Sequence, residues 1–138
     1  MILALDTNVI IDLVRGKAPA VRDRFNAALA AEQPMVASLI VLHELHFGCA
    51  LHRDPAGELA RVRVLLSRLE VEPLDEADMS SAARIRAALR GRGLTIGPYD
   101  ALIAGQALAR GWTVVTANTR EFARIGGLNV IDWTAPAD

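Results

Sequence analysis

The sequence predicts an α/β fold, a three-layer α/β/α sandwich with a mostly parallel central sheet. Short β-favouring runs recur along the chain, and stretches with helical periodicity separate them throughout. The first run, at residues 1–6, is apolar without alternation, as in a strand buried on both faces of a parallel sheet. At 138 residues and 52% hydrophobic, the chain is of one-domain length and can bury a full core.

The expected elements follow in order. Strands are predicted at residues 1–6, 34–37, 70–74, 112–117 and 128–131. Helices are predicted at about residues 8–15, 20–31, 38–49, 56–69, 76–91, 99–110 and 119–124. Gly16 and Gly111 end two of these helices, Ser38 is a plausible N-cap, and Pro98 marks the start of another helix. Residues 1–134 are therefore expected to form one domain, with 135–138 as a frayed tail.

Composition narrows the class of protein. No apolar stretch reaches the roughly 20 residues that span a membrane, and the N-terminus has no basic region or cleavage site. Cys49 is the only cysteine, so an internal disulfide is impossible, which fits a reducing cytoplasm. The net charge of −1 provides no overall basic field. We expect a cytoplasmic protein without a membrane segment.

Three carboxylates stand where chemistry is expected. Asp6 directly follows the first strand, at the rim where open α/β sheets bind ligands. Glu44 lies in a helix that is apolar nearly all round, where a charge is costly unless it is paired or bound to metal. Asp100 lies in the first turn of a buried helix. Glu44 and Asp100 are both expected in helices that follow short strands. We therefore expect all three acids to lie at one rim of the sheet, where together they indicate a binding site for a divalent cation.

Each of these positions has a simpler interpretation. Asp6 can serve only as a helix N-cap, and the helix dipole alone stabilises a carboxylate at Asp100. Asn118 follows a core-like strand as Asp6 does and offers a neutral oxygen, but it can equally be a turn residue or the N-cap of residues 119–124. Glu121 is expected to be exposed.

The types of candidate ligand atom indicate which metal ion the site would bind. Oxygen ligands without cysteine suit Mg²⁺, or Mn²⁺, rather than zinc. The zinc-protease pattern fails because Phe47 stands where its second histidine is required, so His43, His46 and His52 are interpreted as structural or peripheral. Metal-assisted attack of water on phosphorus is the chemistry that such a cluster supports.

Four motifs in order resemble the PIN-domain ribonucleases, specifically VapC-type toxins of bacterial toxin–antitoxin pairs, over nearly the whole chain. They are Asp6-Thr7-Asn8, Glu44-Leu45 followed by Gly48, Pro98-Tyr99-Asp100-Ala101-Leu102-Ile103-Ala104, and Thr116-Ala117-Asn118-Thr119-Arg120-Glu121-Phe122. The family's acidic triad falls on Asp6, Glu44 and Asp100, which the resemblance makes catalytic and metal-binding. Its frequent fourth acid falls on Asn118, so a full second metal site is in doubt.

The resemblance implies a PIN-like fold and a Mg²⁺-dependent endoribonuclease toxin that cuts structured RNA, commonly tRNA or rRNA. It also implies a homodimer and a small VapB-like antitoxin that blocks the site. One alternative is an inactive PIN-like module that only binds RNA or protein. Another Mg²⁺-dependent phosphoryl-transfer or receiver-type protein is a further alternative, but both classes use a lysine late in the chain, and Lys17 is the only lysine here.

Two surfaces are expected to bind partners. Arg90 and Arg92, in the cluster Arg84, Arg86, Arg90 and Arg92, flank the glycines that lead to Asp100 and are predicted to bind the RNA backbone or an acidic antitoxin side chain. The helices at 38–50 and 56–69 are predicted to form the homodimer interface. The second of them carries an apolar stripe of Leu59, Val62, Leu65, Leu66 and Leu69.

Overall fold

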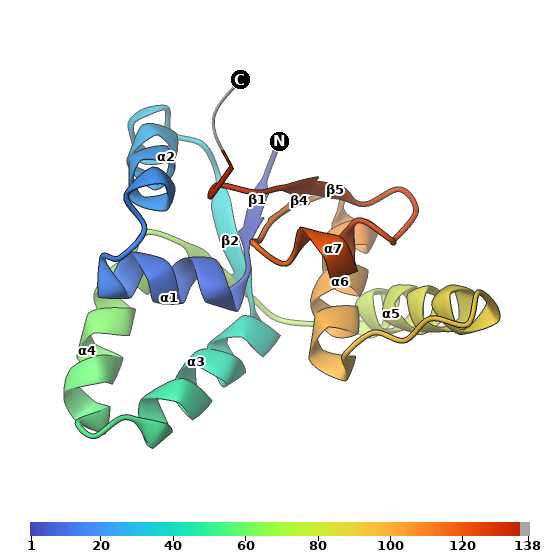
Figure 1. Cartoon of the computed structure of the whole chain (residues 1–138), viewed down its shortest axis with the longest axis horizontal. Coiled ribbons are helices and arrows are strands. Elements are labelled where there is room, and N and C mark those ends of the chain that lie inside the picture. Colours follow the sequence, from blue (N-terminus) through green and yellow to red (C-terminus); the bar gives the residue numbers. More distant parts are fainter. Residues whose placement is uncertain (136–138) are drawn as a thin grey trace.

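The structure, a computed structural model, describes residues 1–135 and contains a parallel sheet in the order β3-β2-β1-β4-β5 (Figure 1). The strands are β1 (Leu3–Leu5), β2 (Met35–Ser38), β3 (Glu70–Glu72), β4 (Thr113–Val115) and β5 (Asn129–Ile131). The helices are α1 (Thr7–Arg15), α2 (Pro19–Ala30), α3 (Leu39–Leu51), α4 (Pro55–Leu66), α5 (Glu76–Gly91), α6 (Pro98–Arg110) and α7 (Thr119–Phe122).

The helices form two outer layers. Figure 1 shows α1, α2, α3 and α4 gathered on one side of the sheet and α5 and α6 on the other. The central strands β1, β2 and β4 are buried along their whole length. The predicted three-layer α/β/α sandwich with a parallel sheet is therefore confirmed. In the described part of the chain, no helix combines the length and apolar character needed to cross a membrane.

The strand before the last helix is shorter than predicted for a local reason. Gly111 adopts a left-handed conformation with φ of 69°, which closes α6. The backbone N–H of Trp112 then donates to the carbonyl of Ala107, 2.9 Å away, so this residue still belongs to the helix end. At the C-terminus the carbonyl of Ala135 accepts a hydrogen bond from Arg24. The rest of the predicted tail, 136–138, lies outside the described residues.

The expectation that the helix around Glu44 is largely buried is wrong. Only Val41, Leu45 and Cys49 of α3 are buried, and their spacing of four residues places them on one face. On the opposite face Phe47 and Leu51 are 62% and 72% exposed. The helix packs against α1 and α4 and also contacts α6, but the face with Phe47 and Leu51 stays exposed, so its apolar composition exceeds what this chain covers.

The apolar stripe of α4 is occupied within its own chain. Val62 is buried, and the other members of the stripe pack against the same core. The last of them, Leu69, lies beyond α4, which ends in a tightened turn where Arg68 and Leu69 donate to carbonyls three residues back. The argument for a homodimer through this stripe therefore loses its basis. Exposed apolar side chains remain at Phe47 and Leu51 of α3 and at Val64 of α4.

The strand order creates a switch point at the centre of the sheet. From β1 the chain builds outward to β2 and β3, and then returns to the other side of β1 to add β4 and β5. Open α/β sheets bind ligands at the carboxyl ends of the strands that flank such a point. Asp6 follows β1 and Thr116 follows β4, so these two side chains occupy that position.

The helices α5 and α6 are fixed together by a buried ion pair. Arg110 donates from Nε to Asp78 Oδ1 at 3.2 Å and from Nη2 to Asp78 Oδ2 at 2.7 Å, while the Asp78 side chain is only 1% exposed. Burial alone would raise the pKa of Asp78, but the bonds from Arg110 and from the backbone N–H of Asp75 outweigh it and hold that pKa below its ordinary value.

The same two helices approach each other most closely at Gly105. A methyl group on Gly105 would lie 2.5 Å from the backbone nitrogen and 2.6 Å from the Cα of Ala82. Because these are backbone atoms, no side-chain rotation can relieve the overlap. Gly105 is therefore required for the distance between α5 and α6, and with it for the position of the α6 N-terminus.

We predict that Gly105→Ala lowers the free energy of unfolding by about 1–3 kcal/mol or more, because the two helices must separate. Gly48→Ala is the control, since a methyl group inside α3 meets no atom within 4 Å there and alanine is the better helix former. Urea unfolding of both variants measures the difference. Equal stability of the two variants would contradict the close approach.

We predict that Arg110→Met costs about 3–5 kcal/mol of stability at pH 7, because it leaves the Asp78 carboxylate buried and unpaired. In the wild type, the depressed pKa of Asp78 stabilises the fold above a pH of about 4, and this contribution is lost as the pH falls through the folded-state pKa. In the variant, burial raises that pKa, so stability should increase as the pH falls from 7 to 5.

Thermal unfolding at several pH values tests this prediction. Arg61→Met is the control, because Arg61 pairs with Glu58 at the surface and should contribute less than about 1 kcal/mol. A variant at Arg110 whose stability follows the wild-type pH profile would show that the pair does not hold Asp78 in its ionised form.

Candidate active site

Asp6 is a helix cap and a rim carboxylate at once. It is 4% exposed and precedes α1, and its Oδ1 accepts from the backbone N–H of Thr7 at 2.8 Å. Its Oδ2 accepts from the hydroxyl of Thr116 at 2.8 Å and from the amide of Asn8 at 3.3 Å. Burial raises the pKa of Asp6, the bonds from Thr116 and Thr7 lower it, and the charge of Glu121 raises it again, with a net rise.

Thr116 connects three segments at the switch point. Its side chain is fully buried, donates to Asp6 and accepts from Asn8 Nδ2 at 3.3 Å and from the backbone N–H of Asn118 at 3.0 Å. Asn8 in turn accepts from the backbone N–H of Ala117 at 3.3 Å. The start of α1 and the turn after β4 are therefore held in a fixed relation by side-chain hydrogen bonds.

Glu44 joins this group from α3. Its side chain is partly buried, and Oε1 accepts from the hydroxyl of Thr7 at 2.8 Å. Thr7 thus contacts both acids, since its backbone N–H binds Asp6 and its hydroxyl binds Glu44. Asp6 and Glu44, which are 38 positions apart in the sequence, come together through one intervening residue.

Asp100 lies in the first turn of α6, beside the other acids. The expectation that its helix follows a strand is wrong, because α6 comes after α5 and the connecting residues 92–97. Burial raises the pKa of Asp100 to about 7, and the charges of Asp6, Glu121 and Glu44 contribute in that order. The other three carboxylates therefore lie close enough for their charges to act on Asp100.

Glu121 is the acid that sequence reasoning missed, because it was expected to be exposed. Its side chain is only 25% exposed, with Oε1 accepting from the backbone N–H of Gly97 and Oε2 from the amide of Asn118, both at 3.0 Å. Burial opposes ionisation of Glu121, yet these two bonds and the charge of Arg124 lower its pKa overall. A usable signal was its place three residues after Asn118, on the same face of a helix.

Asn118 is near the site, with a different contact from the one expected. It precedes α7 but makes no side-chain capping bond, and its amide nitrogen donates to Glu121. The predicted role as a neutral oxygen donor stays a prediction. The structure shows Asn118 orienting the neighbouring carboxylate.

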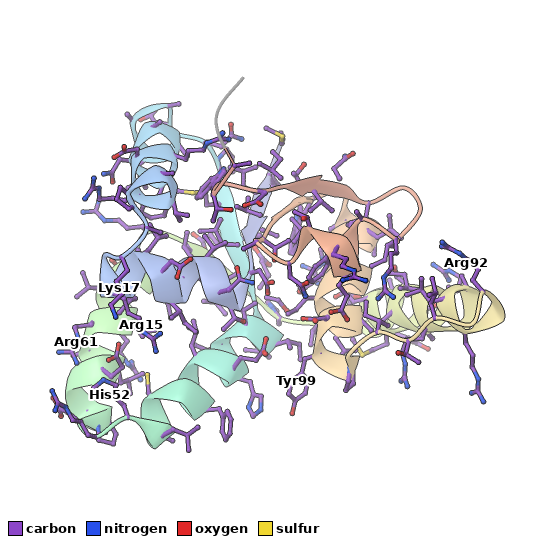
Figure 2. The ribbon with its side chains drawn as sticks, in the orientation of Figure 1. Arg15, Lys17, His52, Arg61, Arg92 and Tyr99 are labelled. Atoms are coloured by element: carbon purple, nitrogen blue, oxygen red, sulfur yellow. The ribbon has the colours of Figure 1, made fainter. Side chains whose placement is uncertain are left out.

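The exposed rim beside the acids carries an aromatic pair. Tyr99, next to Asp100, and His43, next to Glu44, have ring centroids 5.4 Å apart at 74°, and the Tyr99 hydroxyl lies 3.4 Å from His43 Nε2. Figure 2 shows Tyr99 projecting from the start of α6 into the space next to α3. The two helices that supply Glu44 and Asp100 are therefore also in contact at the surface.

The oxygen donors at this rim have the chemistry that a divalent cation needs. Within residues 1–135, no three acidic, histidine or cysteine side chains are arranged so that they alone could hold a metal ion. Mg²⁺ nevertheless takes one or two carboxylates directly and keeps several waters. A cluster of four carboxylates, with the pKa of Asp100 raised by burial and by the charges of its neighbours, has the charge that such a hydrated cation would neutralise. The residues fit a hard divalent ion.

Comparison with known proteins identifies the family. The family model for the PIN domain matches residues 3–128. The tRNA(fMet)-specific endonuclease VapC of Shigella flexneri is 40% identical over 130 residues, covering 94% of this chain and 96% of that protein. The enzyme of the same name from Salmonella typhimurium is 42% identical over 129 residues, covering 94% and 96%.

A solved structure agrees with this assignment. The crystal structure of VapBC2 from Rickettsia felis bound to a DNA fragment from its promoter contains a chain that matches with a TM-score of 0.90 and 30% identity. The match covers 96% of this chain and 99% of that one. PIN-domain nucleases generally depend on divalent metal ions. The fold and the sequence similarity agree over almost the whole chain, which belongs to the PIN-domain family and, within it, to the VapC ribonucleases.

Proposed function

We propose that this protein is the toxin of a VapBC-type pair and cleaves tRNA, with initiator tRNA(fMet) as the first candidate substrate. The observation that carries the proposal is the cluster of Asp6, Glu44, Asp100 and Glu121 at the switch point of the sheet. The two VapC relatives named for tRNA(fMet) cleavage, at 40% and 42% identity, support the choice of substrate. Hydrolysis of a phosphodiester bond would take place at this cluster.

We infer that Mg²⁺ is the metal, with Mn²⁺ as a substitute, and that Asp6, Glu44 and Asp100 hold it with Glu121 as the fourth acid. When bound, such an ion polarises the phosphate and lowers the pKa of a bound water. The chain's own contribution is orientation. Thr116 and Thr7 direct Asp6 and Glu44, while the amide of Asn118 and the backbone N–H of Gly97 direct Glu121.

A VapB-like antitoxin is the proposed regulator, supported by the similarity to the VapBC2 complex. A homodimer is also proposed, supported by the exposed Phe47, Leu51 and Val64. An RNA substrate of this class would place the protein in the cytoplasm. The alternative of an inactive PIN-like binding module is disfavoured, because a module that only binds RNA gains nothing from four mutually repelling carboxylates.

We predict that Asp6→Asn, Asp100→Asn and Glu121→Gln each reduce cleavage of tRNA(fMet) by more than about 100-fold, since loss of a group that only orients a metal ligand already costs 10–100-fold. Thermal unfolding without metal should show equal or slightly greater stability for the Asp6 and Asp100 variants, because the fold raises the pKa of both groups and so disfavours their charge, and lower stability for Glu121→Gln, because the fold lowers the pKa of Glu121. Cleavage is measured with Mg²⁺ and with EDTA. Asp23→Asn is the control, since Asp23 is 71% exposed and pairs only with Arg22.

A folded Asp6 or Asp100 variant that cuts tRNA at the wild-type rate in Mg²⁺ would remove that residue from the site. Failure of the wild-type protein to cut any tRNA or rRNA with Mg²⁺ or Mn²⁺ would contradict the proposed function as a whole.

We predict that Thr116 acts as a positioning residue. Thr116→Val keeps the shape but removes the acceptor of the backbone N–H of Asn118, one of the two acceptors of the Asn8 amide and one of the two donors to Asp6 Oδ2. Cleavage should fall by about 10–100-fold, and the Mg²⁺ concentration for half-maximal activity should rise. Thr116→Ser restores the hydroxyl and should restore both quantities. A purely structural role predicts a loss of stability with an unchanged Mg²⁺ dependence in the folded fraction.

A further inference from the structure

A hollow in the surface runs along α5. It has a volume of about 650 Å³ and lies between one face of α5 and the returning residues Leu94, Thr95 and Ile96. Arg86 and Arg90 line it from the helix, together with two alanines. Its floor is therefore apolar, and its charged groups are both guanidinium groups.

This hollow adjoins a second one that leads to the carboxylates. The second hollow, of about 350 Å³, shares Thr95 with the first and is lined also by Arg120, Arg124 and Glu121. Gly97 lines it too, and a methyl group there would lie 3.7 Å from Asp100 Oδ2. The two hollows together, called here the arginine groove, lead from the acidic cluster along the loop and α5.

Most of the positive charge in the arginine groove has no partner in the structure. Among residues 1–135, neither Arg86, Arg90 nor Arg120 forms an ion pair. Arg124 is partly engaged, with Nη2 donating to the carbonyl of Thr95 at 2.9 Å and lying 3.9 Å from Glu121. Glu121 is the only acid that lines the groove.

The arginines of α5 separate into two sets. Arg86 and Arg90 are one turn apart and share a face. Arg84 and Arg92 line a different hollow of about 240 Å³, where Arg84 donates to Ser80 and Arg92 to the carbonyl of Arg124. Figure 2 shows Arg92 at the far end of α5. Arg92 lies past the helix end and lines a different hollow from Arg90, and the expected role of the two arginines in binding RNA or antitoxin stays a prediction.

We propose that the arginine groove binds the sugar–phosphate backbone of the RNA strand that enters the acidic cluster. Planar guanidinium forks match phosphate oxygens, and the apolar floor gives riboses and bases a surface to pack on. Four carboxylates repel the polyanionic RNA that must reach them, and the unpaired arginine side chains beside the acidic centre offset this repulsion. This assignment rests on the proposed function and adds to it the path of the substrate.

Salt-dependent binding tests the groove. In an Asp6→Asn background, the dissociation constant of a full-length initiator tRNA transcript is measured by fluorescence anisotropy across a range of salt concentrations. Arg86→Ala with Arg90→Ala should weaken binding and reduce the slope of log K against log salt by about 1.5, because two phosphate contacts are lost. The same double variant with Asp6 intact should raise KM and leave kcat within a few-fold of wild type.

The matched control lies on the same helix. Arg84→Ala with Arg92→Ala removes the same charge from the other hollow and should leave the slope unchanged. Equal slopes for both double variants, whether both reduced or both unchanged, would overturn the proposal. So would a groove variant that binds tRNA normally but no longer binds a polyglutamate peptide, since the groove would then recognise protein. These outcomes differ from failure of the proposed function, in which wild-type protein cuts no RNA.

Discussion

The hydrogen bond between Thr116 and Asp6 is the contact on which the rest of the site depends, because it joins the carboxyl ends of β1 and β4 across the switch point. From Asp6 the connection continues through Thr7 to Glu44. From Thr116 it continues through Asn118 to Glu121, and from there to Gly97 at the start of α6. Residues from the first third and the last third of the chain are thus connected to one pair of adjacent strands.

The close placement of several carboxylates is electrostatically unfavourable. Burial of the site, followed by the charges of Asp6, Glu121 and Glu44, raises the pKa of Asp100 to about 7. The surrounding structure compensates with rigidity away from the cluster. The Asp78–Arg110 pair and the contact at Gly105 lock α5 against α6, which keeps the N-terminus of α6 in place although its first turn carries an unfavourable charge.

The sequence predicted best those features for which the position of a residue and its chemical type lead to the same conclusion. The bounds of α5 at residues 76 and 91 follow from periodicity and flanking residues, and Asp6 follows from its place after a buried strand. Glu121 escaped detection because an acid in the first turn of a short helix is stabilised by the helix dipole and needs no other explanation. Its burial arises from Gly97, 24 positions away, which no local pattern reveals.

Two other differences have a similar origin. The exposure of Phe47 depends on which neighbours cover α3, and the composition of a helix does not contain that information. Arg92 differs from Arg90 in orientation because the helix ends between them, so that helical spacing no longer applies. In each case the property belongs to the contact between elements, whereas the sequence pattern describes one element at a time.

The hydroxyl of Thr116 has a single proton and two lone pairs, and all three are used. Its proton points to Asp6 because both lone pairs already accept N–H groups, so the network has only one possible direction. Asp6 Oδ2 receives donors from two sides and has no free place for a proton of its own. The carboxylate of Asp6 is thus held from two directions at this oxygen, one from the end of β4 and one from α1. One hydroxyl group thereby fixes Asp6 Oδ2 as a hydrogen-bond acceptor and sets the orientation of the carboxylate at this end of the acidic cluster.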